Sequence, residues 1–212
     1  MKAALRSTVH RVAAYLRYRD LDGPERASQR ARNIRRIELL KRFIAARGVG
    51  AELGVHKGYF TPVLLAGLAP AKLYLIDPWY LQGKQWSWGG EGNRRAVDAL
   101  SRILHDLEDE LASGKAVLRI DDDLAALAKM PDEHLDWAYL DTTHQYDHTA
   151  SELELLKLKV KPGGIVAGDD WRSDASHRHH GVCKAVREFV GRERCTLVHA
   201  DEISMQWVLR LN

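Results

Sequence analysis

The sequence contains few cysteines and no long apolar run. Only Cys183 and Cys195 occur among its 212 residues, and they form no CxxC pair. Two isolated cysteines are typical of reduced thiols packed as small hydrophobes, not of a disulfide framework. No apolar stretch approaches the ~20 residues that a membrane-spanning helix needs, and arginines interrupt the first 20 residues, which argues against a secretory signal. We therefore expect a cytoplasmic protein without a membrane span.

The dinucleotide-binding pattern GxGxxG is also missing, which argues against a nicotinamide-dependent oxidoreductase. Charge is nearly balanced but unevenly spread. The formal net charge is +3, yet residues 1–47 carry 13 Lys/Arg against 4 Asp/Glu, a balance of +9, so the remainder carries −6. A basic surface can bind nucleic acid, anionic lipid or a phosphorylated substrate. Solvated faces of basic helices give the same asymmetry, and both interpretations remain open.

Apolar residues at helical spacing predict an amphipathic helix over residues 3–18 and a second helix that runs to about residue 47. We expect residues 1–48 to form a helical extension that covers the substrate side or serves a homodimer interface. From residue 49 the pattern changes to alternating strands and helices, without a repeat or linker. We therefore expect residues 49–212 to form one domain.

The strand–helix alternation predicts a fold of the α/β class, a Rossmann-like doubly wound sheet. Five strands should be parallel and joined by helical crossovers. The last two are linked too closely for a crossover and should form an antiparallel hairpin, which gives seven strands in all. The predicted strands span residues 50–55, 72–76, 116–120, 135–140, 164–167, 195–199 and 204–209.

Candidate binding residues follow the first three predicted strands. Glu52, Gly54 and Gly58 form an ExGxxxG turn between a strand and a helix, where glycine lets a ligand approach the backbone. Asp77 ends the second strand, about 20 residues later, at the position that binds ribose in nucleotide-type α/β folds. A structural turn explains the glycines equally well, and Asp77-Pro78 is also a turn signal.

Acidic residues also follow the third strand. Asp121, Asp122 and Asp123 stand where this strand meets its helix. One of them, with Asp122 and Asp123 as the candidates, is placed to bind an adenine amino group. Capping of the helix N-terminus is a fair explanation for any single one of these side chains.

Aspartates at the ends of the fourth and fifth strands predict a metal site. Asp141 follows the fourth strand, and Asp169 and Asp170 follow the fifth. Ligands of an open α/β sheet lie outside the carboxyl ends of its strands, so these side chains should converge there. Carboxylates crowded together repel unless they share a cation, and oxygen ligands favour Mg²⁺ or another hard divalent ion. Capping of a turn by Asp169 and Asp170 is the alternative.

These motifs together resemble the class I S-adenosylmethionine (SAM)-dependent methyltransferases from about residue 49 to the end. The chain is most similar to small metal-dependent O-methyltransferases of the macrocin and aminocoumarin-sugar type. The likeness depends on Asp141-x-x-His144-x-Tyr146, the LysProGlyGly run and GlyAspAsp followed by an aromatic residue. In that group the three aspartates matching Asp141, Asp169 and Asp170 hold a divalent metal. The resemblance also implies that the ExGxxxG turn faces the cationic methionine head of SAM.

The resemblance implies methyl transfer to a hydroxyl of a small molecule, with a sugar favoured over a phenolic or catechol-like acceptor. Related catechol-type enzymes carry a lysine base three residues after the first aspartate. Here that residue is His144, so a histidine would accept the proton, and a structural role for it is equally open. The histidine-rich cluster of residues 176–180 follows the predicted metal ligands, so one of its histidines could reach the substrate or a soft metal. We favour a polar surface loop, because no fourth ligand is evident.

Two alternatives of other classes remain. A nucleic-acid methyltransferase would use the basic N-terminal helices to bind phosphates. However, the fourth strand lacks the Asn/Asp-Pro-Pro-Tyr signature of enzymes that methylate base amino groups. The other alternative is a binding protein that keeps the fold without the chemistry, against which the intact acids at 77, 141, 169 and 170 argue.

Overall fold

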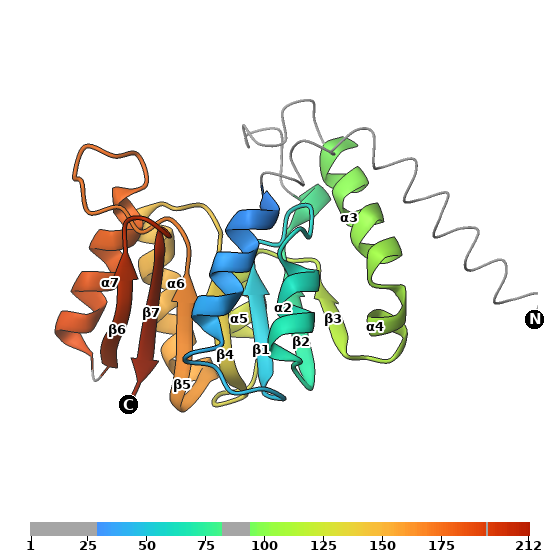
Figure 1. Cartoon of the computed structure of the whole chain (residues 1–212), viewed down its shortest axis with the longest axis horizontal. Coiled ribbons are helices and arrows are strands. Elements are labelled where there is room, and N and C mark those ends of the chain that lie inside the picture. The colour runs from blue at the N-terminus through green and yellow to red at the C-terminus, as the bar shows by residue number, and fades with distance from the viewer. Residues whose placement is uncertain (1–28, 82–93, 194) are drawn as a thin grey trace, which may run out of the picture.

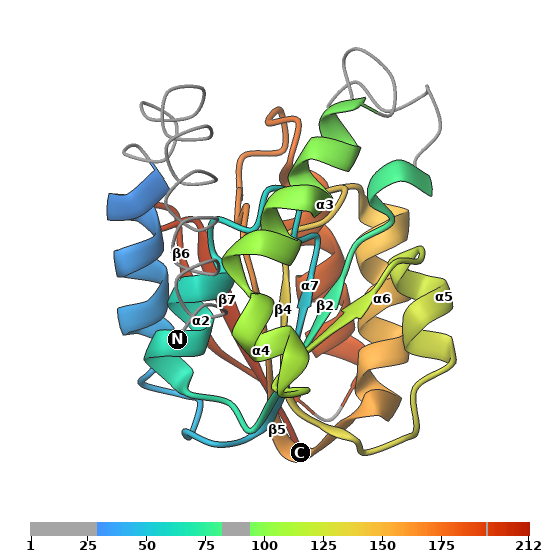
Figure 2. The same cartoon turned by 90° about the vertical axis from the view of Figure 1, so that its right-hand side faces the viewer.

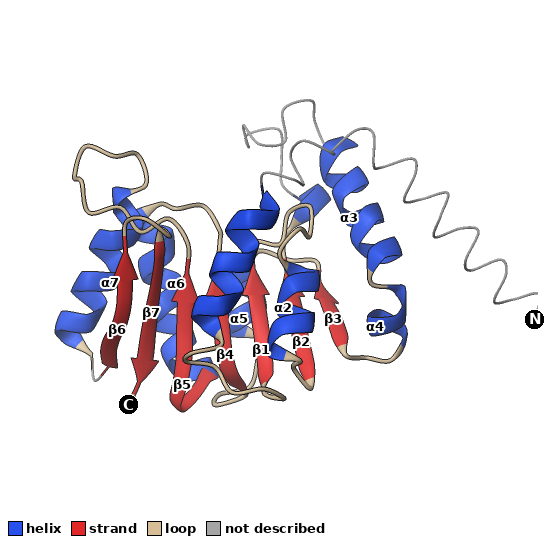
Figure 3. Cartoon of the chain, in the orientation of Figure 1, coloured by secondary structure: helices blue, strands red, loops and turns tan. Residues whose placement is uncertain are grey.

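The fold is a seven-stranded mixed sheet with helices on both faces (Figures 1 and 3). The computed structural model describes residues 29–81, 94–193 and 195–212. In chain order the strands are β1 (Val49–Leu53), β2 (Lys72–Ile76), β3 (Ala116–Arg119), β4 (Leu135–Leu140), β5 (Val160–Gly168), β6 (Cys195–Asp201) and β7 (Gln206–Leu211).

The strand order is β3-β2-β1-β4-β5-β7-β6. The first five strands run parallel, and β7 is antiparallel to both β5 and β6. The predicted α/β class and its terminal hairpin are therefore confirmed. Chain order reverses on the two sides of β1, where Leu53 pairs with Ile76 of β2 and with Leu140 of β4. Such a switch point leaves a crevice beyond the carboxyl ends of the strands, where ligands bind.

Helices cover both faces of the sheet. The helix at residues 29–40, blue in Figure 1, lies with α2 on one face, and α5 and α6 lie on the other (Figure 2). In chain order the labelled helices are α2 (Thr61–Leu68), the 3-10 turn η1 (Trp79–Leu81), α3 (Arg94–Asp106), α4 (Glu108–Ala112), α5 (Asp123–Ala128), α6 (Tyr146–Lys159) and α7 (His180–Arg192).

The two faces bury separate apolar clusters. Ile37 and Leu40 of the 29–40 helix pack with Leu64 of α2 on one face. Leu153 of α6 and Phe189 of α7 pack on the other. Each fully buried side chain of this size contributes about 1.5–3 kcal/mol relative to exposure. The apolar side of the 29–40 helix is therefore fixed against its own sheet.

The N-terminal helices differ in part from the prediction. The first, over residues 3–18, lies outside the described residues. The second ends at residue 40, not near residue 47. Its last turn tightens because Arg42 and Phe43 donate to carbonyls three residues earlier, at 3.0 Å each, which is 3-10 geometry. Within the described ranges no helix is long and apolar enough to cross a membrane.

Candidate functional site

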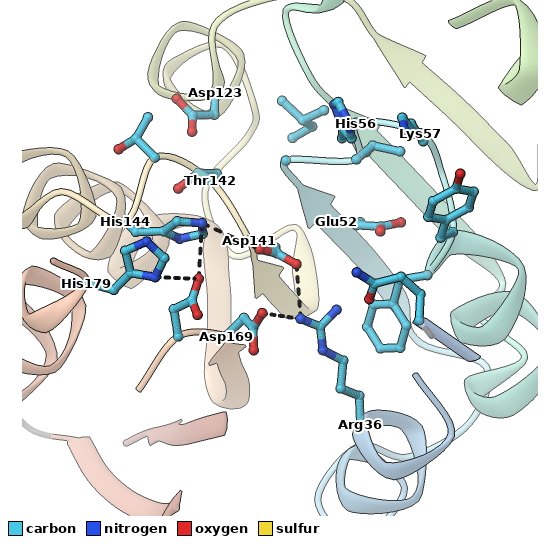
Figure 4. Close-up of a pocket in the computed structure, with 18 of the residues that line it drawn as sticks. Arg36, Glu52, His56, Lys57, Asp123, Asp141, Thr142, His144, Asp169 and His179 are labelled. Carbon is cyan, nitrogen blue, oxygen red and sulfur yellow. Dashed lines mark hydrogen bonds and ion pairs between the residues drawn. The ribbon is translucent and has the colours of Figure 1, made fainter. Parts of the chain in front are cut away.

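A large cavity opens beyond the carboxyl ends of the parallel strands. Its volume is about 1080 Å³, as large as the ~300–1,000 Å³ sites that hold small ligands. Residues following β1, β4 and β5 form its floor, and the 29–40 helix forms one wall (Figure 4). The predicted site residues that line it are Glu52, Gly54, Asp122, Asp123, Asp141, His144, Asp169 and Asp170.

The turn after β1 needs glycine for two separate reasons. Gly54 and Gly58 have φ values of 82° and 69°, in the left-handed region. A Cβ on Gly54 would lie 2.1 Å from the carbonyl oxygen of Asp141, and one on Gly58 would lie 2.7 Å from Ile103 Cγ1. The ends of β1 and β4 can approach this closely only because Gly54 has no side chain.

Replacing Gly54 with alanine is expected to lower the free energy of unfolding by more than about 3 kcal/mol. The left-handed backbone alone costs about 1–2 kcal/mol for a residue with a Cβ, and the contact with the Asp141 backbone adds to it. Gly114→Ala is the matched control, because Gly114 has φ 73° and a Cβ added there would meet no atom within 4 Å. Urea unfolding of both variants measures the difference; equal losses would show that the close approach contributes nothing.

Glu52, at the end of β1, is buried and faces the cavity. Its Oε2 accepts a hydrogen bond from Thr61 Oγ1 at 2.6 Å. Burial raises the pKa of Glu52 to about 8, and the Thr61 hydrogen bond opposes that shift. A cationic ligand group beside this carboxyl would favour its ionised form.

Asp77 organises the turns after β1 and β2. Its Oδ2 accepts from the backbone N–H of His56 at 2.8 Å, and its Oδ1 accepts from that of Trp79 at 2.7 Å. Burial raises the pKa of Asp77 in spite of these two hydrogen bonds. The side chain lies behind the cavity wall that His56 and Pro78 form. Each carboxylate oxygen can accept a second hydrogen bond besides the one it has.

The two acids Asp122 and Asp123, which follow β3, make different contacts. Asp122 caps α5, and its Oδ1 accepts from the N–H groups of Leu124 and Ala125. Asp123 is buried, and its Oδ2 lies 2.8 Å from His148 Nε2. The cap uses Oδ1 of Asp122, and this residue also lines the cavity.

An acid–histidine cluster forms where β4 and β5 end. His144 Nε2 lies 3.1 Å from Asp170 Oδ2 and 3.9 Å from Asp141 Oδ1. His179 Nδ1 lies 3.2 Å from the same Asp170 oxygen, and Figure 4 shows the two imidazoles side by side. Burial alone would raise the pKa of Asp170, but the charges of His144 and His179 bring it below its ordinary value.

Asp169 has different partners from its neighbour Asp170. Its Oδ2 binds the guanidinium groups of both Arg32 and Arg36, and its Oδ1 accepts from Gln206 Nε2. Arg36 also lies 3.3 Å from Asp141 Oδ2, so its guanidinium stands between the two aspartates (Figure 4). Burial and the nearby Asp141 charge raise the pKa of Asp169 to about 6, against the effect of the two arginines.

These contacts test whether the site fits a metal. Donor atoms of Asp141, His144 and Asp170 all lie within 4.8 Å of one another. Carboxylate and imidazole donors at such spacing fit a divalent ion. Asp169 is oriented toward the arginines, so it can join these ligands only after its contacts with Arg32 and Arg36 break. The residues present therefore fit a metal on Asp141 and Asp170, with the third ligand open between His144 and Asp169.

Several of these residues were not predicted from the sequence. Arg32 and Arg36 are spaced i, i+4, which places both side chains on one face of a helix. This spacing does not show that they contact Asp169. His148 and Glu152 have the same spacing on α6. His179 belongs to the segment 176–180, for which the sequence favours a polar surface loop over a histidine that reaches the substrate; it lines the cavity and contacts Asp170.

The sequence of this chain matches a known protein family. Residues 51–171, more than half of the chain, match the family model described as a methyltransferase domain. The chain belongs to this methyltransferase family. The matched region contains the ExGxxxG turn and all three aspartates at the ends of β4 and β5. No curated protein sequence matches the chain.

Solved structures show the same fold at low sequence identity. A Corynebacterium glutamicum protein has a TM-score of 0.60 at 13% identity, over 98% of this chain and 95% of its own. A Streptococcus mutans protein assigned to the methyltransferases, in complex with SAH, has 0.56 at 15%, over 82% and 94%. An SAH-bound Podospora anserina methyltransferase has 0.56 at 10%, over 77% and 71%. This chain therefore has the fold of SAM-dependent methyltransferases.

Proposed function

We propose that this protein is an O-methyltransferase that uses SAM to methylate a hydroxyl of a small molecule, a sugar or a phenolic compound, with help from a divalent cation. One observation carries the proposal. The cluster of Asp141, His144 and Asp170 opens into the same cavity as the turn of Glu52 and Gly54. The residues proposed to bind SAM and those proposed to accept the hydroxyl proton therefore face the same cavity. In-line methyl transfer requires this proximity of cofactor and acceptor.

The cofactor would bind along the ends of β1, β2 and β3. Glu52 and the backbone at Gly54 and Gly58 would face the methionine head, whose positive charge favours a carboxylate neighbour. Asp77 would accept from the ribose hydroxyls. Asp122 would accept from the adenine amino group, with Asp123 behind it.

The acceptor would bind at the ends of β4 and β5. Asp141 and Asp170 would hold Mg²⁺ or a similar cation, and Asp169 would become the third ligand once it separates from its arginines. Such a cation, when bound, lowers the pKa of a hydroxyl beside it. His144 would accept the hydroxyl proton at Nε2, because Asp170 at 3.1 Å stabilises the resulting imidazolium.

Replacing His144 with asparagine tests whether His144 acts as the general base or as a ligand of the cation. Asparagine tolerates the left-handed backbone of His144, φ 61°. As a base, His144 contributes about 10²–10⁴-fold to turnover, so the variant should lose this much while its Mg²⁺ affinity stays unchanged. His105→Asn, on the exposed side of α3, is the control and should retain both. A parallel loss of Mg²⁺ affinity would contradict the base role and assign His144 as a ligand.

The acceptor class is tested by incubating the protein and SAM with sugars, catechols and a short RNA. Mass spectrometry then detects methylated products. We expect methylation of hydroxyl compounds that stops with EDTA and returns with Mg²⁺. Methylated RNA without a methylated small molecule would contradict the proposal. Support for the small molecule comes from Arg32 and Arg36, two residues of the basic N-terminal region that contact Asp169 at the cavity.

A further inference from the structure

A second group of two acids and a histidine comes from α5 and α6. Asp123 is the first residue of α5, and His148 and Glu152 are one turn apart on the same face of α6. Asp123 and His148 line the cavity, whereas Glu152 lies behind them with no exposed surface. Figure 4 shows Asp123 apart from the Asp141–His144 side.

The donor atoms of the three side chains lie close together. His148 Nε2 lies 2.8 Å from Asp123 Oδ2 and 3.8 Å from Glu152 Oε1. All three donor atoms lie within 4.8 Å of one another. Ligand bonds of about 2.0–2.2 Å place neighbouring donors about 3–3.5 Å apart around an ion, so only small side-chain shifts would complete a three-ligand site.

Glu152 supplies independent support for a ligand. Its side chain is fully buried, and within the described part of the chain neither carboxylate oxygen has a hydrogen-bond partner of normal geometry, although Asp123, Thr142 and His148 lie close enough to act on it. A buried carboxyl without partners is costly unless a proton or a cation neutralises it. Burial and the adjacent Asp123 carboxylate raise the pKa of Glu152 well above its ordinary value. A proton shared between Asp123 and Glu152 is therefore the competing explanation.

We propose that Asp123, His148 and Glu152 form a second divalent cation site, separate from Asp141 and Asp170. One imidazole and two carboxylates suit a borderline transition metal, Zn²⁺ or Mn²⁺, better than Mg²⁺. The cation ties the N-terminus of α5 to α6 and leaves its open coordination positions on the cavity side, where Asp123 and His148 are accessible. In this arrangement Asp123 binds the cation, and Asp122 Oδ2 alone serves the adenine position.

The test counts ions in variants of the full-length chain. Metal-free protein is titrated with Zn²⁺ alone by calorimetry, and bound zinc is measured after gel filtration. The parent for comparison is Asp170→Asn, in which the first cluster is weakened. This parent should bind one Zn²⁺, and adding Glu152→Gln or His148→Gln should lower its affinity at least about 100-fold, more than the loss of an outer-shell contact does.

Thermal unfolding with and without Zn²⁺ gives a second readout that needs no activity. Zn²⁺ should raise the Tm of Asp170→Asn and leave that of Asp170→Asn/Glu152→Gln unchanged. If the Glu152→Gln variant misfolds, the comparison of Asp170→Asn with Asp170→Asn/His148→Gln provides the same test. Unchanged Zn²⁺ binding in both pairs, or no binding by the Asp170→Asn parent, would overturn this site in favour of the shared proton. Neither result tests the proposed cation site of Asp141 and Asp170. If that first site were wrong, the Asp170→Asn variant would keep the Mg²⁺-dependent turnover of the parent protein.

Discussion

Replacing Asp170 with asparagine is expected to lower methyl transfer at least about 100-fold while the affinity for S-adenosylhomocysteine stays within about twofold. Asp170 faces both His144 and His179 and offers an oxygen to the proposed cation, so the change removes the charge on which proton transfer and cation binding depend. Asparagine has the same shape and tolerates the left-handed backbone at this position, φ 58°. Single-turnover assays with saturating SAM, at several Mg²⁺ concentrations, measure the loss.

Asp147→Asn is the matched control for this experiment. Asp147 lies in the first turn of α6 and is exposed, so its loss should cost no more than about 1 kcal/mol of helix stability and no turnover. Parent-like turnover in Asp170→Asn would remove the carboxylate cluster from the proposed mechanism. An equal loss in Asp147→Asn would show that the effect is not specific to the cluster.

Replacing Arg36 with methionine should lower the free energy of unfolding by about 3–5 kcal/mol at pH 8, the usual result of removing one partner of a buried ion pair. The side chain of Arg36 is 4% exposed and serves both Asp169 and Asp141. Arg32 still contacts Asp169, but it is more exposed, which places the expected loss toward the lower end of the range. Methionine fills part of the same space without a charge, and the change removes the guanidinium with its ion pair to Asp169 and its cation–π contact with Phe60.

The stability loss should depend on pH. The pKa of Asp169 is already raised to about 6 in the folded protein, and removing Arg36 raises it further. A carboxyl whose pKa is higher folded than unfolded loses stability as pH rises from its unfolded value, near ~4, through its folded value. The Arg36→Met variant should therefore be closer to the parent at pH 5 than at pH 8.

Two variants control the Arg36 experiment. Arg36→Met/Asp169→Asn removes the uncompensated charge as well and should recover much of the stability at pH 8. Arg42→Met changes an exposed arginine two residues beyond the 29–40 helix and should stay within about 0.5 kcal/mol of the parent. Chemical denaturation at both pH values measures all four proteins. The same small loss for Arg36→Met and Arg42→Met would show that Arg36 carries no buried ion pair.

The strands were predictable because their signals are local. Buried parallel strands read as short apolar runs, and β2 and β4 begin and end where those runs do. The acids that follow them then had to lie at one edge of the sheet. β5 was predicted too short, since its first residues include Pro162 and two glycines, which weaken a strand signal. These residues lie at an irregular part of the β4–β5 pairing, where the register shifts.

The composition of the site was only half predictable. Asp141, His144 and Asp170 follow strands in the sequence, so topology alone brings them together. The partners of Asp169 come from Arg32 and Arg36, more than a hundred residues earlier, and only packing of their helix on the sheet directs them inward. Periodicity gives the face of that helix but not what the face meets. The same limit applies to His148 and Glu152.

The cofactor assignment is tested most directly by a calorimetric titration of S-adenosylhomocysteine into the purified protein in Mg²⁺ buffer. We predict one site with micromolar affinity, which corresponds to about −8 kcal/mol. Glu52→Gln should weaken this binding, because Glu52 is the carboxyl placed at the methionine head. Absence of binding heat at several temperatures would contradict the assignment and leave a protein that keeps the methyltransferase fold without its cofactor.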